Sequence, residues 1–577
     1  MNKIKEPFLS FEFAGEDGKI HPLAFRDPLK IIIAHKIEDV YPSFMQIQQA
    51  VKDGYYAAGF VSYESAPAFD PAFEVNNQPT MPLVWFGIFS EPVGQTFMSE
   101  GQYELSDWQP NTSIAEYEAA IETIKSQIKN GNTYQTNYTI RLSSHFSGDD
   151  LAFFNSLKTA QSSNYCSYIN TGDFSVLSAS PELFFHLKDD RITTRPMKGT
   201  IARGKTLEED EEHAKWLSNS EKNQAENVMI VDLLRNDLSM IAKQGTVKVP
   251  KLFQIEHYPT VHQMTSTITA EVKPDTALFD VFKALFPCGS ITGAPKISTM
   301  QLIANIETAP RDVYCGAIGY ITPEHEAIFN VPIRTVLINH QTGQATYGVG
   351  GGITWDSTSN DEYNEVLTKA KLLKKKKPAF HLLESILLTQ GKFEFLEEHL
   401  NRMEKSSVYF NFRFDREKVK HLLLDFCKSQ KTGDYKVRLQ LSEFGEVMME
   451  AQPLHQPNTV TVKLADSPID KENLFLYHKT TNRDLYFQFQ QPDVFDVLLW
   501  NENQELTEFT NGNVVLELDG KLYTPPIKCG LLAGTFREIL LKNGTIQVKV
   551  LTLRDLAACS HIWFINSVRK WIKVELL

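Results

Sequence analysis

A run of four lysines, Lys374–Lys377, followed by Pro378 closes a helical stretch and divides the sequence in two. Like charges repel and proline cannot continue a helix, so a solvated linker is expected here. A chain of 577 residues is too long for one ordinary domain, and length alone suggests three or four structural units. We therefore expect domains at residues 1–373 and 380–577, joined by residues 374–379.

The composition excludes several classes of protein. Apolar content of 42% and charged content of 22% are typical of a globular chain, and a net charge of −13 argues against nucleic acid as a partner. The six cysteines are scattered singly, which makes a zinc site improbable and favours reduced thiols. The sequence shows neither a signal-peptide pattern nor eighteen unbroken apolar residues. We expect a cytoplasmic protein without a membrane span.

The segment Arg195–Thr200 places a lysine between a proline that fixes the backbone and a glycine that frees it. The apolar run Leu183–Phe185 lies upstream, so a turn that follows strands is expected. If this turn carries Lys198 into a pocket, desolvation would lower the pKa of the amine and make it a nucleophile. On these six residues alone, an ordinary solvent-exposed lysine is the more frequent alternative.

Polar residues accompany this lysine on neighbouring predicted strands. Gln135 and Asn137 alternate with other side chains and share one strand face, which is either a wet surface or the wall of a polar pocket. Glu182 opens the apolar strand Leu183–Phe185. It is therefore a candidate acid or base with a raised pKa, or else a glutamate that caps a turn.

Two further segments are suited to binding anions. Phe286–Lys296 supplies small residues and hydroxyls, Ser290 and Thr292 among them, just before a helix expected at 297–306. Because the spacing of a Walker loop is absent, a carboxylate is the expected anion. Beyond Tyr314, Arg334 could hold a carboxylate in a bidentate fork.

A glycine cluster and a set of glutamates complete the candidate groups of the first half. Gly350 and Gly352 lie in a segment whose backbone could approach a ligand closely. Helical spacing over 225–238 is expected to bury Val228, Val231 and Leu234 or Leu238 and to leave Glu226 near the first turns. Glu226 is either a solvated glutamate at the start of a helix or, with Glu362 and Glu365 on a second helix, part of a hard-oxygen site suited to Mg²⁺.

The order of these motifs resembles that of the chorismate-binding enzymes, which include anthranilate, isochorismate and aminodeoxychorismate synthases. The matching motifs, within about residues 50–373, are Gln135, Ser180–Glu182, Pro196–Thr200, Ala225–Asn227, Asp232–Asp237, Gly289–Lys296, Ile333–Thr335, Gly350–Gly352 and Glu362–Glu365. The resemblance implies an α/β (α+β) fold in which two large antiparallel sheets pack as a sandwich flanked by helices. One departure is that His262 precedes Gln263, whereas the family has its histidine one position later.

The resemblance also implies a role for each residue. Glu226 and Glu365, with Glu362, would hold Mg²⁺, and Lys198 would attack the ring at C2 with Glu182 as general acid or base. Gln135 stands where isochorismate synthases have a water-activating lysine, and lysine at 198 is characteristic of aminodeoxychorismate synthases. The implied substrate-binding residues are Gln135, Gly199, Thr200, Ser290, Thr292, Tyr314, Arg334, Gly350 and Gly352.

The second half carries the groups that pyridoxal phosphate requires. Lys479 could form the Schiff base, Glu508 could face the pyridine nitrogen, and the glycine–threonine turn at Gly534 and Thr535 could hold the phosphate. Arg402, on a predicted amphipathic helix, is either a surface residue or a second phosphate ligand.

These groups resemble those of the fold-type IV pyridoxal enzymes, which include branched-chain and D-amino-acid aminotransferases and aminodeoxychorismate lyase. The resemblance covers about residues 380–573 and implies a smaller α+β domain of two subdomains, with Arg402, Lys479, Glu508, Asn513, Gly534 and Thr535 at the cofactor. A dimer through this domain is a further expectation.

Together the two resemblances imply consecutive steps of p-aminobenzoate synthesis: amination of chorismate at C4, then loss of pyruvate. No Gly-x-Cys-x-Gly nucleophile elbow is found, so ammonia would come from a separate glutamine amidotransferase or from solution. The alternatives are an anthranilate or isochorismate synthase fused to an aminotransferase, and a non-catalytic scaffold that binds ligands.

Overall fold

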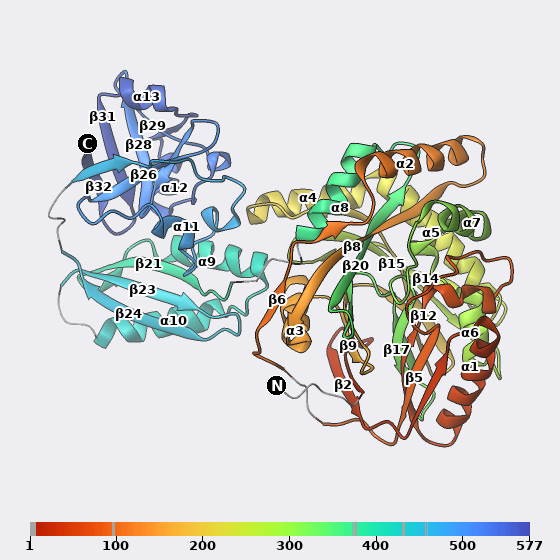
Figure 1. Cartoon of the computed structure of the whole chain (residues 1–577). Coiled ribbons are helices and arrows are strands. Elements are labelled where there is room, and N and C mark those ends of the chain that lie inside the picture. Colours follow the sequence, from red (N-terminus) through yellow and green to blue (C-terminus); the bar gives the residue numbers. More distant parts are fainter. Residues whose placement is uncertain are drawn as a thin grey trace. The chain divides into compact units, whose positions relative to one another are not determined.

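The computed structural model describes residues 7–94, 98–371, 373, 378–429, 433–455, 457 and 460–577. The chain divides into two compact units: unit 1 comprises Met1–Ala202 and Ala214–Lys377, and unit 2 comprises Arg203–His213 and Pro378–Leu577. Figure 1 shows both units, coloured along the sequence. Of the predicted linker, the four lysines at 374–377 lie outside the described residues. Within the described part of the chain, no helix combines the length and apolar character needed to cross a membrane.

Unit 1 contains two ten-stranded sheets, in which neighbouring strands run antiparallel. The first sheet has the strand order β16 (Gly293–Ala294), β8 (Gln135–Gly148), β20 (Gln344–Ile353), β19 (Thr335–Asn339), β10 (Phe174–Ser180), β9 (Tyr165–Asn170), β1 (Phe8–Ala14) and β2 (Ile20–Arg26), with β6 (Tyr103–Leu105) and β7 (Gln109–Pro110) paired to β8. The second has the order β13 (Met197–Ala202), β15 (Val261–Glu271), β12 (Arg191–Arg195), β11 (Leu183–Lys188), β18 (Ala327–Asn330), β17 (Ala317–Ile321), β4 (Tyr56–Val61), β5 (Val84–Phe89) and β3 (Lys30–Ala34), with β14 (Lys248–His257) paired to β15.

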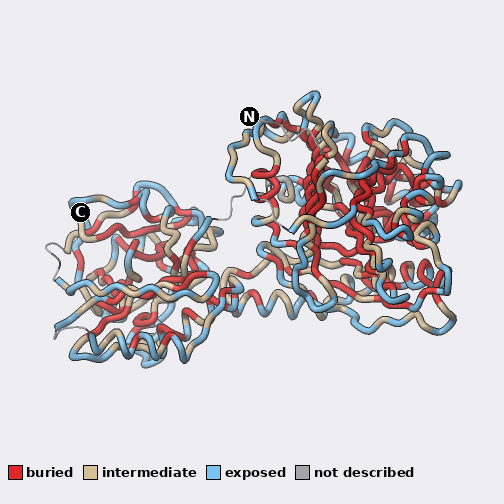
Figure 2. The backbone as a smooth tube through the Cα atoms, turned by 90° about the horizontal axis from the view of Figure 1, so that it is seen from below, coloured by how far each residue is buried: buried red, intermediate tan, exposed pale blue. Residues whose placement is uncertain are grey.

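Three apolar clusters show that unit 1 is layered. One cluster joins the facing sides of the two sheets, with Phe11 of the first sheet and Phe60 of the second among its fully buried members. The outer face of each sheet packs on helices, as in the clusters that contain Ile121 of α2 (Ile114–Lys129) and Phe282 of α6 (Leu278–Leu285). The predicted sandwich of two large antiparallel sheets flanked by helices is confirmed. Figure 2 shows the buried strands in red and the exposed outer helices and loops in blue.

The helices of unit 1 begin where local signals place them. Ser113 caps α2 by accepting from Glu116 N (3.3 Å), and the Glu116 carboxylate accepts from Ser113 N (2.8 Å), a reciprocal capping box. The helical elements are α1 (Ile37–Lys52), η1 (Tyr63–Ala68), α2 (Ile114–Lys129), α3 (Asp150–Gln161), α5 (Glu221–Ser239), α6 (Leu278–Leu285), η2 (Gly289–Ile291), α7 (Lys296–Ile306) and α8 (Ser359–Lys371). The helix α4 (Leu207–Asn219) starts in the segment assigned to unit 2 and ends in unit 1.

Unit 2 combines a four-stranded antiparallel sheet with a larger, barrel-like sheet, as the resemblance implied. The smaller sheet has the order β22 (Lys392–Phe393), β21 (Leu382–Thr389), β23 (Tyr435–Leu441) and β24 (Val447–Pro453). The larger has the order β27 (Leu506–Phe509), β26 (Asp496–Trp500), β25 (Thr461–Leu464), β32 (Lys570–Leu576), β31 (His561–Asn566), β28 (Gly512–Leu518), β29 (Lys521–Thr524) and β30 (Gln547–Val548). An additional pairing of β27 with β28 closes six of these strands into a ring.

The helices of unit 2 cover both sheets. Leu400 and Met403 of α9, with Val419 and Leu423 of α10, pack on one face of the four-stranded sheet in a single apolar cluster. The helical elements are α9 (Leu396–Phe410), α10 (Arg416–Ser429), η4 (Leu474–Leu476), α11 (Asp484–Phe487), η5 (Ile527–Cys529), α12 (Thr535–Lys542) and α13 (Leu553–Ala558). The loop before α12 contacts α9, because the Arg402 guanidinium donates to the carbonyl oxygen of Ala533 at 3.1 Å.

Candidate functional sites

One cavity of unit 1, with a volume of about 460 Å³, gathers most of the predicted site residues. That volume is within the range typical of small-molecule sites. Its lining includes Glu182, Lys198, Gly199, Thr200, Glu226, Ser290, Tyr314, Arg334, Gly350, Gly352, Glu362 and Glu365. These residues come from both sheets, from α5 and α8, and from η2, so only the tertiary fold brings them together.

Lys198 lies on β13, at the edge of the second sheet, rather than in a turn. The pairing of β13 with β15 shifts register between Met197 and Thr200, and Gly199 between them has a φ of +97°. The glycine signal in the sequence therefore marks a bulge in a strand. Burial lowers the pKa of the Lys198 amine, although the carboxylates of Glu226 and Glu182 act in the opposite direction.

Glu182 is the candidate general acid or base in the cavity that contains this amine. Its side chain is 2% exposed, and its carboxylate accepts from the Ser290 hydroxyl at 2.6 Å. Burial raises its pKa to about 7, while the Ser290 hydrogen bond and the charge of Lys198 limit the rise. The carboxyl can therefore hold or release a proton near neutral pH, as general acid–base catalysis requires.

Gln135 and Thr292 do not line this cavity. Gln135 lies behind Gly352: a Cβ atom added at Gly352 would lie 1.9 Å from Nε2 of Gln135 and 2.7 Å from Nζ of Lys198. The Oε1 atom of Gln135 is buried without a hydrogen-bond partner among the described residues. The Thr292 hydroxyl donates within its own loop, to the carbonyl oxygens of Cys288 (3.2 Å) and Gly289 (3.3 Å).

Three carboxylates line the same cavity beside the lysine. The Glu362 carboxylate accepts from the Ser357 hydroxyl at 2.7 Å, and Glu365 forms an ion pair with Lys369 at 2.8 Å. Burial raises the pKa of Glu362, and the charge of Glu365 raises it further. Because a divalent cation would relieve this repulsion and prefers carboxylate oxygens, the three glutamates including Glu226 fit Mg²⁺.

Strand alternation explains the exchanged histidine and glutamine. Gln263 lines the cavity and donates from Nε2 to the Thr200 hydroxyl at 3.0 Å. His262, the preceding residue of β15, is fully buried, and its Nδ1 lies 2.8 Å from Nδ1 of His257. Successive side chains of a strand point to opposite faces, so a shift of one position moves the histidine away from the cavity.

Two residues that the sequence did not single out also position the site. Nδ2 of Asn227 donates to the carbonyl oxygen of Lys198 at 3.2 Å, and the Ser266 hydroxyl donates to Oδ1 of Asn227 at 2.6 Å. The Lys369 amine donates to the carbonyl oxygen of Gly350 at 2.8 Å. In the sequence, Asn227 stands out only because it follows Glu226 on a predicted helix. Apolar periodicity alone does not predict that this asparagine is buried and hydrogen-bonded.

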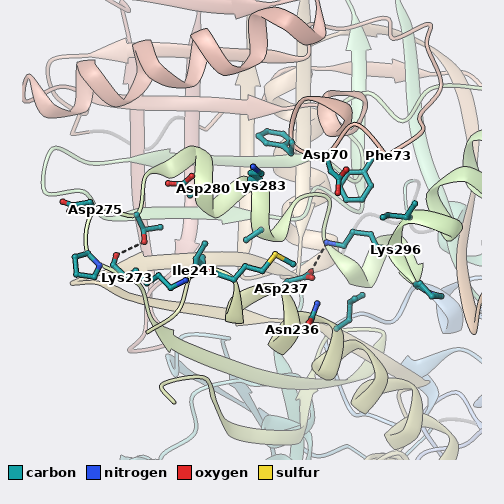
Figure 3. A pocket seen from close by; sticks show the side chains of 18 residues that line it. Asp70, Phe73, Asn236, Asp237, Ile241, Lys273, Asp275, Asp280, Lys283 and Lys296 are labelled. Carbon is teal, nitrogen blue, oxygen red and sulfur yellow. Dashed lines mark hydrogen bonds and ion pairs between the residues drawn. The ribbon is translucent and has the colours of Figure 1, made fainter. Parts of the chain in front are cut away.

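A second cavity of unit 1, of about 740 Å³, contains none of the predicted site residues. Figure 3 shows its wall, with the Lys296 amine directed at Asp237 and with Asp70 and Phe73 nearby. Lys296 and Asp237 form a buried ion pair at 2.9 Å. This pair ties the start of α7 to the end of α5, the two elements next to the Lys198 cavity.

In unit 2, Lys479 is the first of the candidate cofactor residues. Its backbone carbonyl accepts from Leu383 N at 2.9 Å, which fixes the lysine beside the start of β21. Burial and the positive charge of Arg402 together lower the pKa of its amine to about 7. A substantial share of the amine is therefore uncharged near neutral pH and can attack an aldehyde, which is the first requirement of a Schiff-base lysine.

Arg402 and Thr535 meet at the start of α12. The Arg402 guanidinium binds Glu384 (2.6 Å) and donates to the carbonyl oxygen of Ala533 (3.1 Å), and the Thr535 hydroxyl lies 3.5 Å from Nε2 of His399. A Cβ atom at Gly534 would lie 2.0 Å from Oδ1 of Asn513, so only glycine permits this approach.

Glu384, fully buried between Arg402 and His399, is a further residue that the sequence did not single out. Burial alone would raise its pKa, but the charges of Arg402 and His399 hold it at about 2. An arginine fixed by a carboxylate beside a helix N-terminus is suited to a phosphate group.

Glu508 is buried, with a relative exposure of 4%, and burial raises the pKa of its carboxyl to about 8. Its carboxylate accepts from the Tyr486 hydroxyl (2.8 Å), from Nδ2 of Asn513 (3.3 Å) and from Leu532 N (3.2 Å). A buried carboxyl that is short of a positive partner fits the ring nitrogen of pyridoxal phosphate. The residues of unit 2 therefore fit this cofactor.

Comparison with known proteins identifies both parts of the chain. Residues 16–375 match the family model described as chorismate binding enzyme, and residues 381–577 match the model described as amino-transferase class IV. The chain is 39% identical over 264 residues to aminodeoxychorismate synthase component 1 of Salmonella typhimurium, which covers 46% of this chain and 58% of that protein. It is 39% identical over 254 residues to the protein of the same name from Bacillus subtilis, covering 44% of this chain and 54% of the other. The match thus spans little more than half the length of these relatives.

Among solved structures, anthranilate synthase component I of Streptococcus pneumoniae has the same fold as the first part. The superposition has a TM-score of 0.51 at 23% identity and covers 65% of this chain and 94% of the other.

Proposed function

Because the chain belongs to the chorismate-binding enzymes and continues into a class IV aminotransferase domain, we propose that it makes p-aminobenzoate from chorismate and ammonia. Unit 1 aminates chorismate at C4, and unit 2 removes pyruvate from the aminated product. The observation that carries this proposal is one cavity that contains both groups: the Lys198 amine, whose pKa is lowered by burial, and the Glu182 carboxyl, which can be protonated near neutral pH.

In the first step, the neutral Lys198 amine adds to C2 of the ring as the C4 hydroxyl departs. Glu182 supplies the proton with which that hydroxyl leaves as water. Ammonia then forms a bond to C4, and the lysine is expelled from C2 and regenerated. Gln263, which cannot donate a proton at neutral pH, assists only through a hydrogen bond.

The substrate is held by groups at both ends of the cavity. Arg334, whose Nη1 also donates to Gln161 (3.0 Å), and Tyr314 would bind the enolpyruvyl carboxylate. Glu226, Glu362 and Glu365 would hold Mg²⁺, which neutralises the ring carboxylate when bound. Gly199, Thr200, Ser290 and Gly352 would surround that carboxylate closely enough to exclude water.

In the second step, pyridoxal phosphate, when bound to unit 2, supplies an electron sink for the bonds that break on the substrate. Lys479 would hold the cofactor and afterwards move a proton within the substrate, so that pyruvate leaves and the ring becomes aromatic. Arg402 and Thr535 would bind the phosphate, and Glu508 would pair with the ring nitrogen. Asn513 and Gly534 keep the loop before α12 against Glu508.

Ammonia would reach unit 1 from a separate glutamine amidotransferase or from solution. Burial raises the pKa of the thiols of Cys166, Cys288, Cys315 and Cys529, so none of these four suits a nucleophile for glutamine hydrolysis. All six cysteines are free, which supports the cytoplasm as the location. A dimer through unit 2 belongs to the same proposal.

The test is incubation of the full chain with chorismate, Mg²⁺ and ammonium, following p-aminobenzoate by its fluorescence. Lys198→Ala should abolish amination, and Lys479→Ala should let the aminated intermediate accumulate. Anthranilate or isochorismate as product would establish one of the alternative synthases instead. Aromatic product at the wild-type rate from Lys479→Ala would refute the role of unit 2, and no consumption of chorismate would leave a scaffold that only binds ligands.

A further inference from the structure

One face of the four-stranded sheet of unit 2 is not used by the apolar core. Leu439 and Leu441 of β23 point to the core that α9 and α10 cover. Because side chains alternate along a strand, Lys436 and Arg438 lie on the opposite face. Figure 1 shows β23 between β21 and β24 in this sheet. This second face therefore presents two cations where a core would require apolar side chains.

The register of the sheet relates this face to Lys479. Leu383, which donates to the carbonyl oxygen of Lys479 (2.9 Å), pairs with Gln440, and the next pairs along the strands are Ser385 with Arg438 and Leu387 with Lys436. At about 3.3 Å per residue, Arg438 is displaced about 7 Å and Lys436 about 13 Å along the strand from the level of Leu383. These are distances that one small organic acid can span.

Loops of the larger sheet add two arginines. Arg483 follows Lys479 in the same segment and is fixed by a hydrogen bond from its guanidinium to the carbonyl oxygen of Thr510. Arg569 belongs to a loop anchored on β21, where the Ser567 hydroxyl donates to the carbonyl oxygen of Ser385 at 3.3 Å. The loop and the strand thus face each other at the level of Arg438.

The positive charge of this face is not balanced. Among the described residues, no ion pair joins Lys436, Arg438, Arg483 or Arg569 to a carboxylate. Glu450, opposite Arg438 on β24, accepts from Nε2 of Gln452 instead (2.9 Å).

One of these cations lacks a full set of hydrogen bonds. Nε of Arg438 is buried and has no hydrogen-bond partner within the described part of the chain. Burial lowers the pKa of Lys436, and the charges of Arg438, Arg569 and Arg483 lower it further. A buried donor without a partner is costly unless a ligand satisfies it.

We propose that Lys436, Arg438, Arg483 and Arg569, here called the cationic wall, bind the carboxylates of a dicarboxylic substrate whose amine reacts at the Lys479 site. The inference rests on the proposed function, since the aminated product of unit 1 carries a ring carboxylate and an enolpyruvyl carboxylate. A guanidinium binds a carboxylate through two parallel hydrogen bonds, and an ammonium group adds a compact charge. The wall therefore selects a dianion over the monocarboxylic amino acids that other aminotransferases accept.

The test uses the full chain loaded with pyridoxal phosphate, whose visible absorbance reports on unit 2 alone. Isophthalate, an unreactive dicarboxylate, and benzoate, its monocarboxylate counterpart, are titrated against this absorbance. The wild type should bind isophthalate more tightly than benzoate. Arg438→Gln should weaken the binding of isophthalate about tenfold or more, as expected for the loss of one charge-assisted hydrogen bond, and should weaken the binding of benzoate by less. Lys436→Gln, near the exposed end of the wall, should give a smaller loss in the same direction.

Lys428→Gln provides the matched control, because this exposed lysine of α10 lies on the covered side of the sheet, paired with Asp425 at 2.8 Å. It should bind both probes as the wild type does. Equal affinity for isophthalate in wild type and Arg438→Gln, with the cofactor still bound, would overturn the cationic wall. Failure of the wild type to form p-aminobenzoate would instead overturn the proposed function and leave the probe result unchanged.

Discussion

Replacing Glu182 by glutamine should change how the stability of unit 1 depends on pH. Burial raises the pKa of this carboxyl from 4.5 to about 7 in the folded chain. Because the folded pKa is above the unfolded value, the stabilisation is complete below about pH 4.5 and is lost as the pH rises through about 7. Each pKa unit corresponds to about 1.4 kcal/mol, so ionised Glu182 lowers the free energy of unfolding by roughly 3 kcal/mol at alkaline pH.

A glutamine at this position cannot ionise, and its carbonyl oxygen can still accept from Ser290. The difference in the free energy of unfolding between Glu182→Gln and the wild type is measured at two pH values. Any effect of the substitution that does not depend on pH cancels when the two differences are subtracted. Between about pH 5 and about pH 9, the variant should gain ~2.5 kcal/mol relative to the wild type. Amination should fall by about 10²-fold or more, the usual contribution of a general acid.

The assay is denaturant unfolding of the full chain at both pH values, following the transition of unit 1. Glu118→Gln, an exposed glutamate of α2, serves as the control and should give no change between the two pH values. Lys198→Ala extends the test: because the charge of Lys198 holds the pKa of Glu182 down, its removal should move the loss of stability to higher pH. Parallel stability curves for wild type and Glu182→Gln would refute the raised pKa and the acid role derived from it.

Three further changes are predicted. Gly352→Ala, whose Cβ would lie 2.7 Å from Nζ of Lys198 and 1.9 Å from Nε2 of Gln135, should lower the rate of amination about tenfold or more and should also lower the melting temperature. A wild-type rate would contradict the packing described here. Lys296→Met, which leaves Asp237 buried without its partner, should lower the free energy of unfolding by about 3–5 kcal/mol, checked by denaturant unfolding. Pyridoxal phosphate should bind covalently at Lys479 at a rate that rises with pH and levels off above about 7, because the neutral amine is the form that reacts. Absorbance follows this reaction, and an inflection near the usual lysine pKa of about 10.4 would refute the lowered pKa.

Elements set by local signals could be predicted from the sequence, and those set by tertiary contacts could not. The two ends of α2, Ile114–Lys129, can be located from Ser113 and Gly131 in the sequence, because a capping serine and a following glycine act within one turn of each end. The helix around Glu226 was also predicted, but its buried face was partly wrong, because Val228 is 36% exposed whereas Asn227 is 1% exposed. Apolar spacing cannot assign a polar residue to the interior when its hydrogen bonds come from distant strands.

The candidate sites likewise combine residues that local signals predict with residues that only tertiary contacts bring together. Most of the predicted residues of unit 1 line one cavity, since glycines and isolated charges in apolar strands are local signals. Thr292 does not, because its hydroxyl is used within its own loop. In unit 2, Glu384 was overlooked although a carboxylate within an apolar strand is unusual. Its partners, His399 and Arg402, lie on a helix that only the fold brings to that strand.

The pKa of each reactive lysine is lowered in different surroundings. Around Lys198, burial lowers the pKa while Glu226 and Glu182 raise it, so the reactivity of that amine depends on what neutralises those carboxylates. Around Lys479, burial acts together with the positive charges of Arg402, Arg483 and Lys436, and the negative charge of Glu384 opposes them. A cation that arrives with the substrate would therefore lower the pKa of Lys198 further, whereas the pKa of Lys479 is already about 7 before any substrate binds. The cations that lower the pKa of Lys479 include Arg483 and Lys436 of the cationic wall, so the charges that recognise a dianion also prepare the amine for it.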